Sequence, residues 1–388
     1  MAFPDKPIAH LLGSNGPVHA LAYSASPGTY ILAGSSDRSI RLYNPQPSTS
    51  IHPSSSAASG HLSSNKSSSS SSTNGPPQGR LIQTYSAHGY EVLSLGVSTD
   101  NARFASSGGD RIVFLWDVAT AQTLRRFGVS GASGGSTGGH TARVNAVTFA
   151  GDGDSLLISG GLDSAVRIWD VRRGSSKPIQ VLSEAKDAIS ALAIAGVGGE
   201  QIVAGSVDGR VRSYDVRAGR CVTDYVVPKG VTSLCPTRDG KAVLVGGLDS
   251  KVRLMDRENG GCLKTYADAG WRNEELRVQS ILGGKEQYVL AGDEMTAAAT
   301  AADAASQQSN AAEGKVWAWD VVTGELKAKV RVPWGPAGLE PKKRVIGKDG
   351  KEKERSNVIS CLAWREGGFG DQFCVSGTSG VVTVYGYH

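Results

Sequence analysis

The sequence predicts an all-β fold, a seven-bladed β-propeller in which four short strands form each blade. Three observations lead to this prediction: a segment that recurs along the chain, apolar runs that recur around it, and a glycine-rich composition. The recurrence is plainest in GGLDSAVRIWD at 160–170 and GGLDSKVRLMD at 246–256. Self-similarity of this kind is typical of repeat architectures. The 50 glycines and a charged fraction of 20% suit a β-rich chain with many tight turns.

The recurring segment has the pattern of a strand. It alternates in polarity and is rich in β-branched and aromatic side chains, which is typical of a half-buried strand. Its seven copies end at Asn44, Asp117, Asp170, Asp215, Asp256, Asp320 and Gly386. Most copies follow a turn of small residues that carries an aspartate. Each copy is therefore expected to be the third strand of a blade.

Further apolar runs accompany the copies and supply the other strands. The first run begins at Val18, Val92, Val144, Ile189, Val231 and Val358. Another lies between it and the third strand, such as LLISG from Leu156, and a last one follows, such as CVTDY from Cys221. Compact units are spaced 45 residues from Asp170 to Asp215 and 41 residues from Asp215 to Asp256. Four strands at this spacing match the period of WD repeats, which is roughly 40–45 residues.

The two ends of the sequence predict how the ring closes. The seventh copy ends at Gly386, so its blade lacks a fourth strand, whereas the apolar run Ile8 to Leu12 has no blade of its own. We expect this N-terminal run to complete the last blade and leave only short, protected sheet edges. Residues 8–388 then form a single propeller.

Two blades contain a histidine, a serine, an aspartate and a tryptophan at the spacing of a hydrogen-bond chain. The sets are His88, Ser106, Asp110 and Trp116, and His140, Ser159, Asp163 and Trp169. The first three residue types also compose the catalytic triad of hydrolases. Because the set occurs twice and its aspartate occurs in five blades, we interpret it as a fold element whose buried polar groups satisfy one another.

An arginine also recurs inside the third strands, at Arg41, Arg167, Arg212 and Arg253. Its position within a strand favours pairing with turn carboxylates of neighbouring blades over contact with a ligand. The aliphatic stem can pack while the charged head stays hydrated.

Four insertions interrupt the repeat. Residues 46–80 are Ser-rich and predicted to be disordered. Residues 128–139 form a Gly-rich flexible loop, and residues 293–313 an Ala-rich surface loop. Residues 331–356 hold eight basic and four acidic side chains, and PKKRV at 341–345 is typical of nuclear import or nucleic-acid contact.

The insertions also predict a docking face. In a propeller, connections from the fourth strand of one blade to the first strand of the next share a face with the connections between second and third strands. We call this the loop face. It is expected to carry 128–139, 293–313 and 331–356, with 46–80 on the opposite face. The candidate partner-binding residues are Tyr90, Glu91, Arg143, Trp271, Arg272 and Glu274 at its rim, and Lys342, Lys343 and Arg344 in the basic insertion.

Composition and motifs exclude several classes of function. The five cysteines are odd in number and lack Cys-x-x-Cys spacing, so neither a metal site nor a disulfide framework is expected. The Gly-rich loop has neither a Walker lysine nor a dinucleotide fingerprint, so no cofactor is expected. No apolar run suits a signal peptide or a membrane span. Basic and acidic residues are nearly equal in number, with a net charge of +5, so charge by itself does not indicate a nucleic-acid binder. We expect an intracellular, soluble protein.

Specific stretches resemble one family of WD-repeat proteins. They are AHGYEVL at 87–93, FLWDVATAQTLRRF at 114–127, AGSVDGRVRSYDVRAG at 204–219 and GLDSKVRLMDRENGGCLKTY at 247–266. They resemble the mitogen-activated protein kinase organizer 1 family, also called the WD-repeat-containing protein 83 family, across all seven blades. The resemblance implies a non-catalytic scaffold, associated with kinase cascades and with the spliceosome. The four insertions depart from the compact form of the family.

The leading expectation is an interaction platform in pre-mRNA splicing, which the basic insertion favours, present in nucleus and cytoplasm and monomeric within larger complexes. The alternatives are a cytoplasmic scaffold for a mitogen-activated protein kinase cascade and an enzyme in the propeller channel. Against an enzyme stands the small number of histidines, seven, of which two serve the blades. Direct RNA contact would need aromatic residues among the basic ones, and Trp334 alone accompanies the basic insertion.

Overall fold

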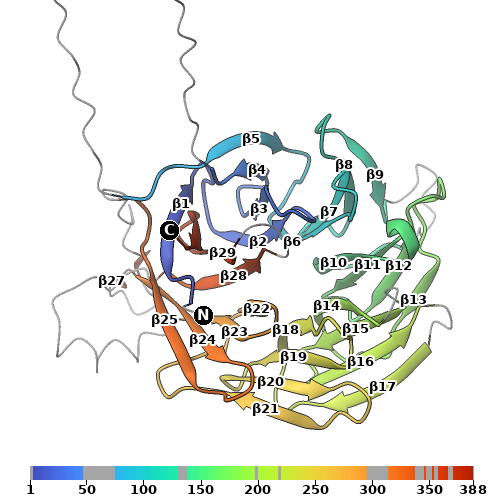
Figure 1. Cartoon of the computed structure of the whole chain (residues 1–388). Coiled ribbons are helices and arrows are strands. Elements are labelled where there is room, and N and C mark those ends of the chain that lie inside the picture. Colours follow the sequence, from blue (N-terminus) through green and yellow to red (C-terminus); the bar gives the residue numbers. More distant parts are fainter. Residues whose placement is uncertain are drawn as a thin grey trace, which may run out of the picture.

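The computed structural model describes residues 3–46, 75–129, 138–196, 200–216, 220–294, 313–336, 345–346, 352–353, 357–365 and 370–387. Within these residues the chain forms seven four-stranded sheets and one two-stranded ribbon. The seven sheets follow one another around a ring (Figure 1). The predicted all-β, seven-bladed propeller is confirmed.

Blades one to six each use four consecutive antiparallel strands. Blade one has β2 (Val18–Tyr23), β3 (Ile31–Ser35), β4 (Ile40–Asn44) and β5 (Arg80–Tyr85), and blade two has β6 (Val92–Val97), β7 (Arg103–Gly108), β8 (Val113–Asp117) and β9 (Thr123–Phe127). Blade three has β10 (Val144–Ala150), β11 (Leu156–Gly161), β12 (Val166–Asp170) and β13 (Gln180–Leu182), and blade four has β14 (Ile189–Ala195), β15 (Gln201–Ser206), β16 (Arg210–Asp215) and β17 (Arg220–Val226). Blade five has β18 (Val231–Pro236), β19 (Ala242–Gly247), β20 (Lys251–Asp256) and β21 (Cys262–Tyr266), and blade six has β22 (Ser280–Gly283), β23 (Tyr288–Gly292), β24 (Gly314–Asp320) and β25 (Leu326–Val332).

Blade seven joins the two ends of the sequence. Its sheet order is β1-β30-β29-β28, with β1 (Lys6–Leu11), β28 (Ile359–Trp364), β29 (Gln372–Gly377) and β30 (Val382–Gly386). β1 pairs with β30 antiparallel, from Lys6 opposite Gly386 to Leu11 opposite Val382. Ala9 and Leu11 are buried. The predicted closure by an N-terminal strand is confirmed, with the strand starting two residues earlier than expected.

Apolar side chains of adjacent blades pack against each other to form the core. Between blades one and two, Tyr85 contacts Phe104, whose ring stacks on Trp116 at a centroid distance of 5.8 Å. The hydroxyl of Tyr85 also donates to the carbonyl oxygen of Val118 at 2.8 Å. Other tyrosine hydroxyls bridge adjacent blades in the same way, through Tyr43 to Leu12, Tyr266 to Val321 and Tyr385 to Arg331. These bonds fix neighbouring blades against one another.

The first strand of each blade lines the central channel. In six blades a register shift follows its first residue, as between Val144 and Ala146. Such a bulge leaves one residue outside the ladder, and here that residue can bond to the next blade. Asn145 Nδ2 donates to the carbonyl oxygen of Ile189 at 2.8 Å, and Ser190 Oγ to that of Val231 at 2.5 Å. Blades three, four and five are therefore joined to one another along the channel wall.

The insertions fall at turns and leave the blades intact. The segment 46–80 lies between β4 and β5, and most of it, like much of 128–139 and 293–313, is outside the described residues. Within 331–356, β26 (Val345–Ile346) pairs with β27 (Glu352–Lys353) in a short ribbon. A 3-10 turn covers Asp152–Asp154. The described part of the chain holds no helix with the length and apolarity to cross a bilayer.

Candidate protein-interaction surface

Both predicted sets of histidine, serine, aspartate and tryptophan form hydrogen-bond chains inside their blades. In blade three the Trp169 indole N–H donates to Ser159 Oγ at 2.8 Å, and His140 Nε2 lies 2.8 Å from the same oxygen. His140 Nδ1 lies 2.8 Å from Asp163 Oδ1. Blade two repeats the chain through Trp116, Ser106, His88 and Asp110 at 2.8, 2.7 and 2.5 Å. The two serines are fully buried, so these hydroxyls hold the blade together and face no substrate.

Burial and charge shift the pKa of two members of the blade-three chain. Burial lowers the pKa of His140, and the neighbouring Asp163 opposes that shift. Burial alone would raise the pKa of Asp163, but hydrogen bonds from His140 and from the Thr141 N–H, with the charge of Arg167, hold it far below its usual range. Both groups bind protons less readily in the folded chain than in the unfolded chain.

These shifts predict that acid destabilises the propeller. Protons favour the state that binds more of them, so the histidine contribution is present above the unfolded histidine pKa of 6.5 and is lost as the pH falls through it. We expect the melting temperature, measured by calorimetry, to be level near about pH 8 and to fall toward about pH 5. In His140→Asn the fall should be smaller, with His10 and His19, whose pKa values burial also lowers, supplying the remainder. An equal slope in both proteins would contradict the assignment to His140.

The recurring arginine pairs within its own blade. Arg41, Arg167 and Arg212 each lie 2.8 Å from the aspartate four residues earlier, which is Asp37, Asp163 and Asp208, and Arg253 pairs with Asp249 in the same way. The prediction of pairing with neighbouring blades is wrong, because the turn between the second and third strands folds its carboxylate back over the strand that follows it. In four blades the arginine thus neutralises the aspartate of the turn between the second and third strands, which lies on the loop face.

Three predicted partner-binding residues precede first strands and lie on the loop face. Tyr90 is 61% exposed, and Glu91, which is partly buried, leads into β6. Arg143 is exposed and leads into β10. Because both strands start from this face, the three residues lie at its surface.

The connection between blades five and six holds the other rim candidates, and one of them is wrongly placed by the prediction. Trp271 is 2% exposed, its indole N–H donates to the carbonyl oxygen of Gly292 at 2.6 Å, and its ring contacts Trp319. Trp271 is therefore a core residue and does not anchor a partner at the surface, because the connection from β21 to β22 brings its side chain between blades five and six. Arg272 is partly exposed and Glu274 is exposed.

The structure places a further charged residue, Arg277, at the channel mouth. Its Nη1 donates to the carbonyl oxygen of Asn145 at 2.7 Å, so the side chain reaches from blade six to blade three, the largest separation that a ring of seven allows. Its Nε–H is buried without a hydrogen-bond partner, and no ion pair forms between Arg277 and any described carboxylate. Burial, and then the charge of Arg143, lower its pKa to about 10. A cavity of about 210 Å³ lies among the first strands of blades two to six, with Arg277 in its wall.

Two more ionisable groups act on this mouth. Burial lowers the pKa of His19, Glu91 opposes the shift, and Arg277 adds to it. The mouth thus combines two arginines with one carboxylate and one histidine. Sequence reasoning missed Arg277 and His19, although Arg277 stands directly before Val278 just as Arg143 stands before Val144.

The remaining candidates, Lys342, Lys343 and Arg344, lie outside the described residues. Among the residues that are described, no three His, Cys, Asp or Glu side chains are grouped to hold a metal ion.

Comparison with known proteins agrees with the fold. The family model "WD domain, G-beta repeat" matches residues 5–44, 79–117, 132–170 and 219–256. Over 180 residues the chain is 29% identical to a WD repeat domain-containing protein 83 homolog of Dictyostelium discoideum, covering 46% of this chain and 42% of that protein. It is 36% identical over 87 residues to a guanine nucleotide-binding protein subunit beta of Zea mays, 22% of each chain. It is 31% identical over 96 residues to the cell division cycle protein cdt2 of Schizosaccharomyces pombe, 25% of this chain and 19% of that protein.

The matched repeats and the seven-bladed ring make the chain a WD40-repeat protein, a class whose propellers typically bind other proteins and are typically non-catalytic. Within that class it is similar to the WD repeat domain-containing protein 83 homolog. The chain spans less than half the length of each of these relatives.

Proposed function

We propose that the chain is a non-catalytic interaction platform in pre-mRNA splicing, and that a protein partner docks on the loop face over the channel mouth. The observation that carries the docking site is Arg277. Its guanidinium crosses the mouth and bonds to a carbonyl oxygen, with one N–H buried and unpartnered.

The chemistry of the mouth favours a carboxylate from the partner. A buried charge without a counter-charge is costly, and a guanidinium forms its strongest hydrogen bonds with carboxylates. An acidic side chain entering from the loop face would supply the missing charge. It would also separate the like charges of Arg277 and Arg143, whose repulsion contributes to the lowered pKa of Arg277. Exposed Tyr90 at the rim suits the role of an aromatic anchor beside that contact.

Two observations support the splicing role over other scaffolding roles. The sequence resembles a family associated with the spliceosome, and PKKRV at 341–345 suits nuclear import. On these grounds we propose that the protein is present in nucleus and cytoplasm and is a monomer within larger complexes. The same family resemblance supports a cytoplasmic kinase-cascade scaffold as the second candidate.

The test is recovery of partners from native cells by the tagged protein, identified by mass spectrometry. Arg277→Gln keeps a hydrogen-bonding side chain but removes the charge, and we expect it to lower recovery of splicing factors about tenfold. Arg173→Gln is the matched control, because Arg173 follows the third strand of blade three on the opposite face and its side chain is 76% exposed. It should recover partners as the unaltered protein does.

Other outcomes discriminate the alternatives. Equal recovery by Arg277→Gln and the control would remove the channel mouth as the docking site. Loss of splicing factors on deletion of 331–356 alone would assign docking to the basic insertion. Recovery of kinase-cascade proteins in place of splicing factors would favour the second candidate. Binding of RNA by the purified chain that weakens as salt rises would favour direct RNA contact.

A further inference from the structure

A buried arginine, Arg257, occupies a position that other blades fill with valine. The residue directly after the closing residue of the third strand is Val118, Val171, Val216 and Val321 in blades two, three, four and six. In blade five it is Arg257, which is 8% exposed. Exchange of a small apolar side chain for a buried cation is unfavourable unless the charge is compensated. Blade five therefore holds a charge that the fold does not need.

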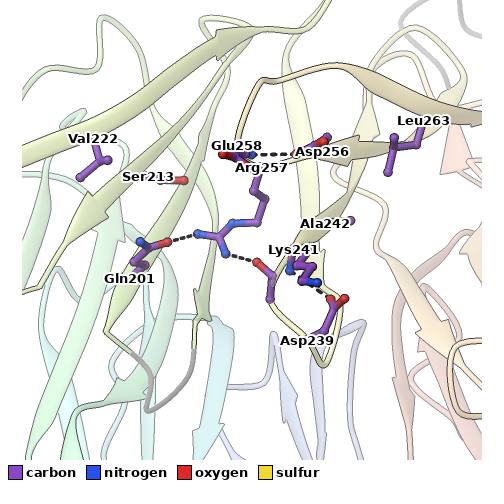
Figure 2. Close-up of a pocket in the computed structure, with 11 residues that line it drawn as sticks. Gln201, Ser213, Val222, Asp239, Lys241, Ala242, Asp256, Arg257, Glu258 and Leu263 are labelled. Atoms are coloured by element: carbon purple, nitrogen blue, oxygen red, sulfur yellow. Dashed lines mark hydrogen bonds between the residues drawn. The ribbon is translucent and has the colours of Figure 1, made fainter.

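The contacts of Arg257 satisfy part of this side chain. Figure 2 shows its guanidinium bonded to Gln201 of blade four and to the loop before β19. There its Nη1 donates to the carbonyl oxygen of Gly240, while its Nη2 donates to Gln201 Oε1. Both acceptors are neutral, and Arg257 forms no ion pair with any residue that the structure describes. Burial accordingly lowers the pKa of Arg257.

Three polar atoms near this arginine are buried without a hydrogen-bond partner: Arg257 Nε, Ser213 Oγ and the Tyr225 hydroxyl. Ser213 lines the same pocket, and Tyr225 lies close enough to Arg257 for their charges to interact. All three atoms carry a hydrogen that they can donate. Buried polar groups are almost always paired, so the unpaired donors of Arg257 and Ser213, which both line the pocket, indicate a site for an acceptor from outside the chain.

The pocket around Arg257 has the size and walls for a protruding side chain. It has a volume of about 620 Å³ and lies between blades four and five, within the usual range of ligand pockets. Val222 and Leu263, on the outer strands of the two blades, are 54% and 57% exposed and form an apolar part of the wall. It opens on the face opposite the loop face, because Arg257 and Gly240 lie in turns on that side.

Two of the three carboxylates that line this pocket, Asp239 and Asp256, are engaged by their own turns, and the third, Glu258, is exposed. Asp239 accepts from the Lys241 N–H at 3.0 Å and from Thr237 at 2.6 Å, and Asp256 accepts from the Glu258 N–H at 2.8 Å. Figure 2 shows the Lys241 and Glu258 contacts away from the Arg257 guanidinium. None of the three carboxylates pairs with Arg257, so its charge has no carboxylate partner among the described residues.

We propose that this pocket binds an aspartate or glutamate side chain of a protein partner, with an adjacent apolar side chain of the partner on Val222 and Leu263. The carboxylate accepts from the Arg257 guanidinium and from the Ser213 hydroxyl, which both line the pocket. A small free anion would leave the apolar wall uncovered, which favours a polypeptide. This site is separate from the channel mouth, so the propeller can hold partners on both faces.

Arg257→Val tests the proposal, because it restores the side chain of four other blades and is expected to leave the melting temperature unchanged or raised. The probes are acetyl-Leu-Glu-Leu-amide and its neutral counterpart acetyl-Leu-Gln-Leu-amide, with binding to the full chain followed by ligand-detected NMR at millimolar peptide. We expect the unaltered protein to bind the glutamate peptide at least about tenfold more tightly than the glutamine peptide. Arg257→Val should lose this preference.

Matched controls isolate the pocket from general charge. Arg238→Val removes an exposed cation from the loop that holds Gly240, and Arg173→Gln removes an exposed cation from blade three on the same face; neither should change the preference. Equal binding of the two peptides, no binding of the glutamate peptide, or an unchanged preference in Arg257→Val would each overturn the proposal. Loss of peptide preference in Arg277→Gln but not in Arg257→Val would instead assign the acidic peptide to the channel mouth.

Discussion

Deletion of residues 1–14 is expected to unfold blade seven and destabilise the whole ring. The deletion removes β1 and exposes the edge of β30, to which β1 is paired over its length. It also removes the buried Leu11, and loss of one such leucine side chain costs about 2–5 kcal/mol. We expect the free energy of unfolding in urea to fall by more than about 4 kcal/mol, with one transition retained or the protein recovered as aggregate.

A circular permutant separates the effect of closure from the effect of shortening. Because Lys6 pairs with Gly386, a short linker can join the end of β30 to the start of β1, with new ends placed in 47–74, outside the described residues. This chain keeps β1 and should retain nearly all the stability. An unaltered unfolding free energy after deletion of residues 1–14 would show that β1 does not close the ring.

Asp163→Ala is expected to be the most damaging single substitution among the turn aspartates. Its carboxylate accepts from the Thr141 N–H at 3.0 Å and from Arg167 at 2.8 Å, and contacts His140 at 2.8 Å. Removal of one partner from a buried charged pair costs about 3–5 kcal/mol, because the remaining charge stays buried. We expect a loss of that size in chemical unfolding.

Asp249→Ala is the matched control for this prediction. Asp249 has the same place in blade five and pairs with Arg253, but its blade has no histidine and serine in the corresponding chain. The loss there should be smaller, about 1–2 kcal/mol. Equal losses for the two variants would show that the hydrogen-bond chain of blade three adds nothing to the ion pair.

The fold could be predicted from the sequence because short local patterns of residues define each repeat. Each third strand alternates in polarity and follows a turn aspartate, so six of the seven first strands and the closure by β1 follow from spacing. The first strand of blade six was missed because β22 has four residues, SILG, and charged and polar residues interrupt the apolar ones before it, Leu276 and Val278. Its place is set by pairing with β23, which is a contact the local pattern does not contain.

The functional surface was less predictable, since exposure depends on how connections pack. Trp271 is of a residue type that often anchors a partner at a surface, but it is a core residue. Arg277 stands among other polar residues in the sequence, and only the structure shows that its side chain crosses the channel. Arg257 occupies a position of the repeat that is valine in four other blades, so the difference can be seen in the sequence alone. Its burial and unpaired Nε are visible only once blades four and five are packed together.

The tyrosine bridges between blades also bear on how the ring moves. Hydroxyls of Tyr43, Tyr85, Tyr266 and Tyr385 tie their blades to a neighbour, whereas the Tyr225 hydroxyl, between blades four and five, is unpartnered. Local opening starts where a structure has the fewest fixed contacts. The fourth strands of blades two and three end in Phe127 and Leu182, which have no hydroxyl. The junctions from blade two to blade five therefore all lack this bond, and local opening of the ring is expected to concentrate in that arc.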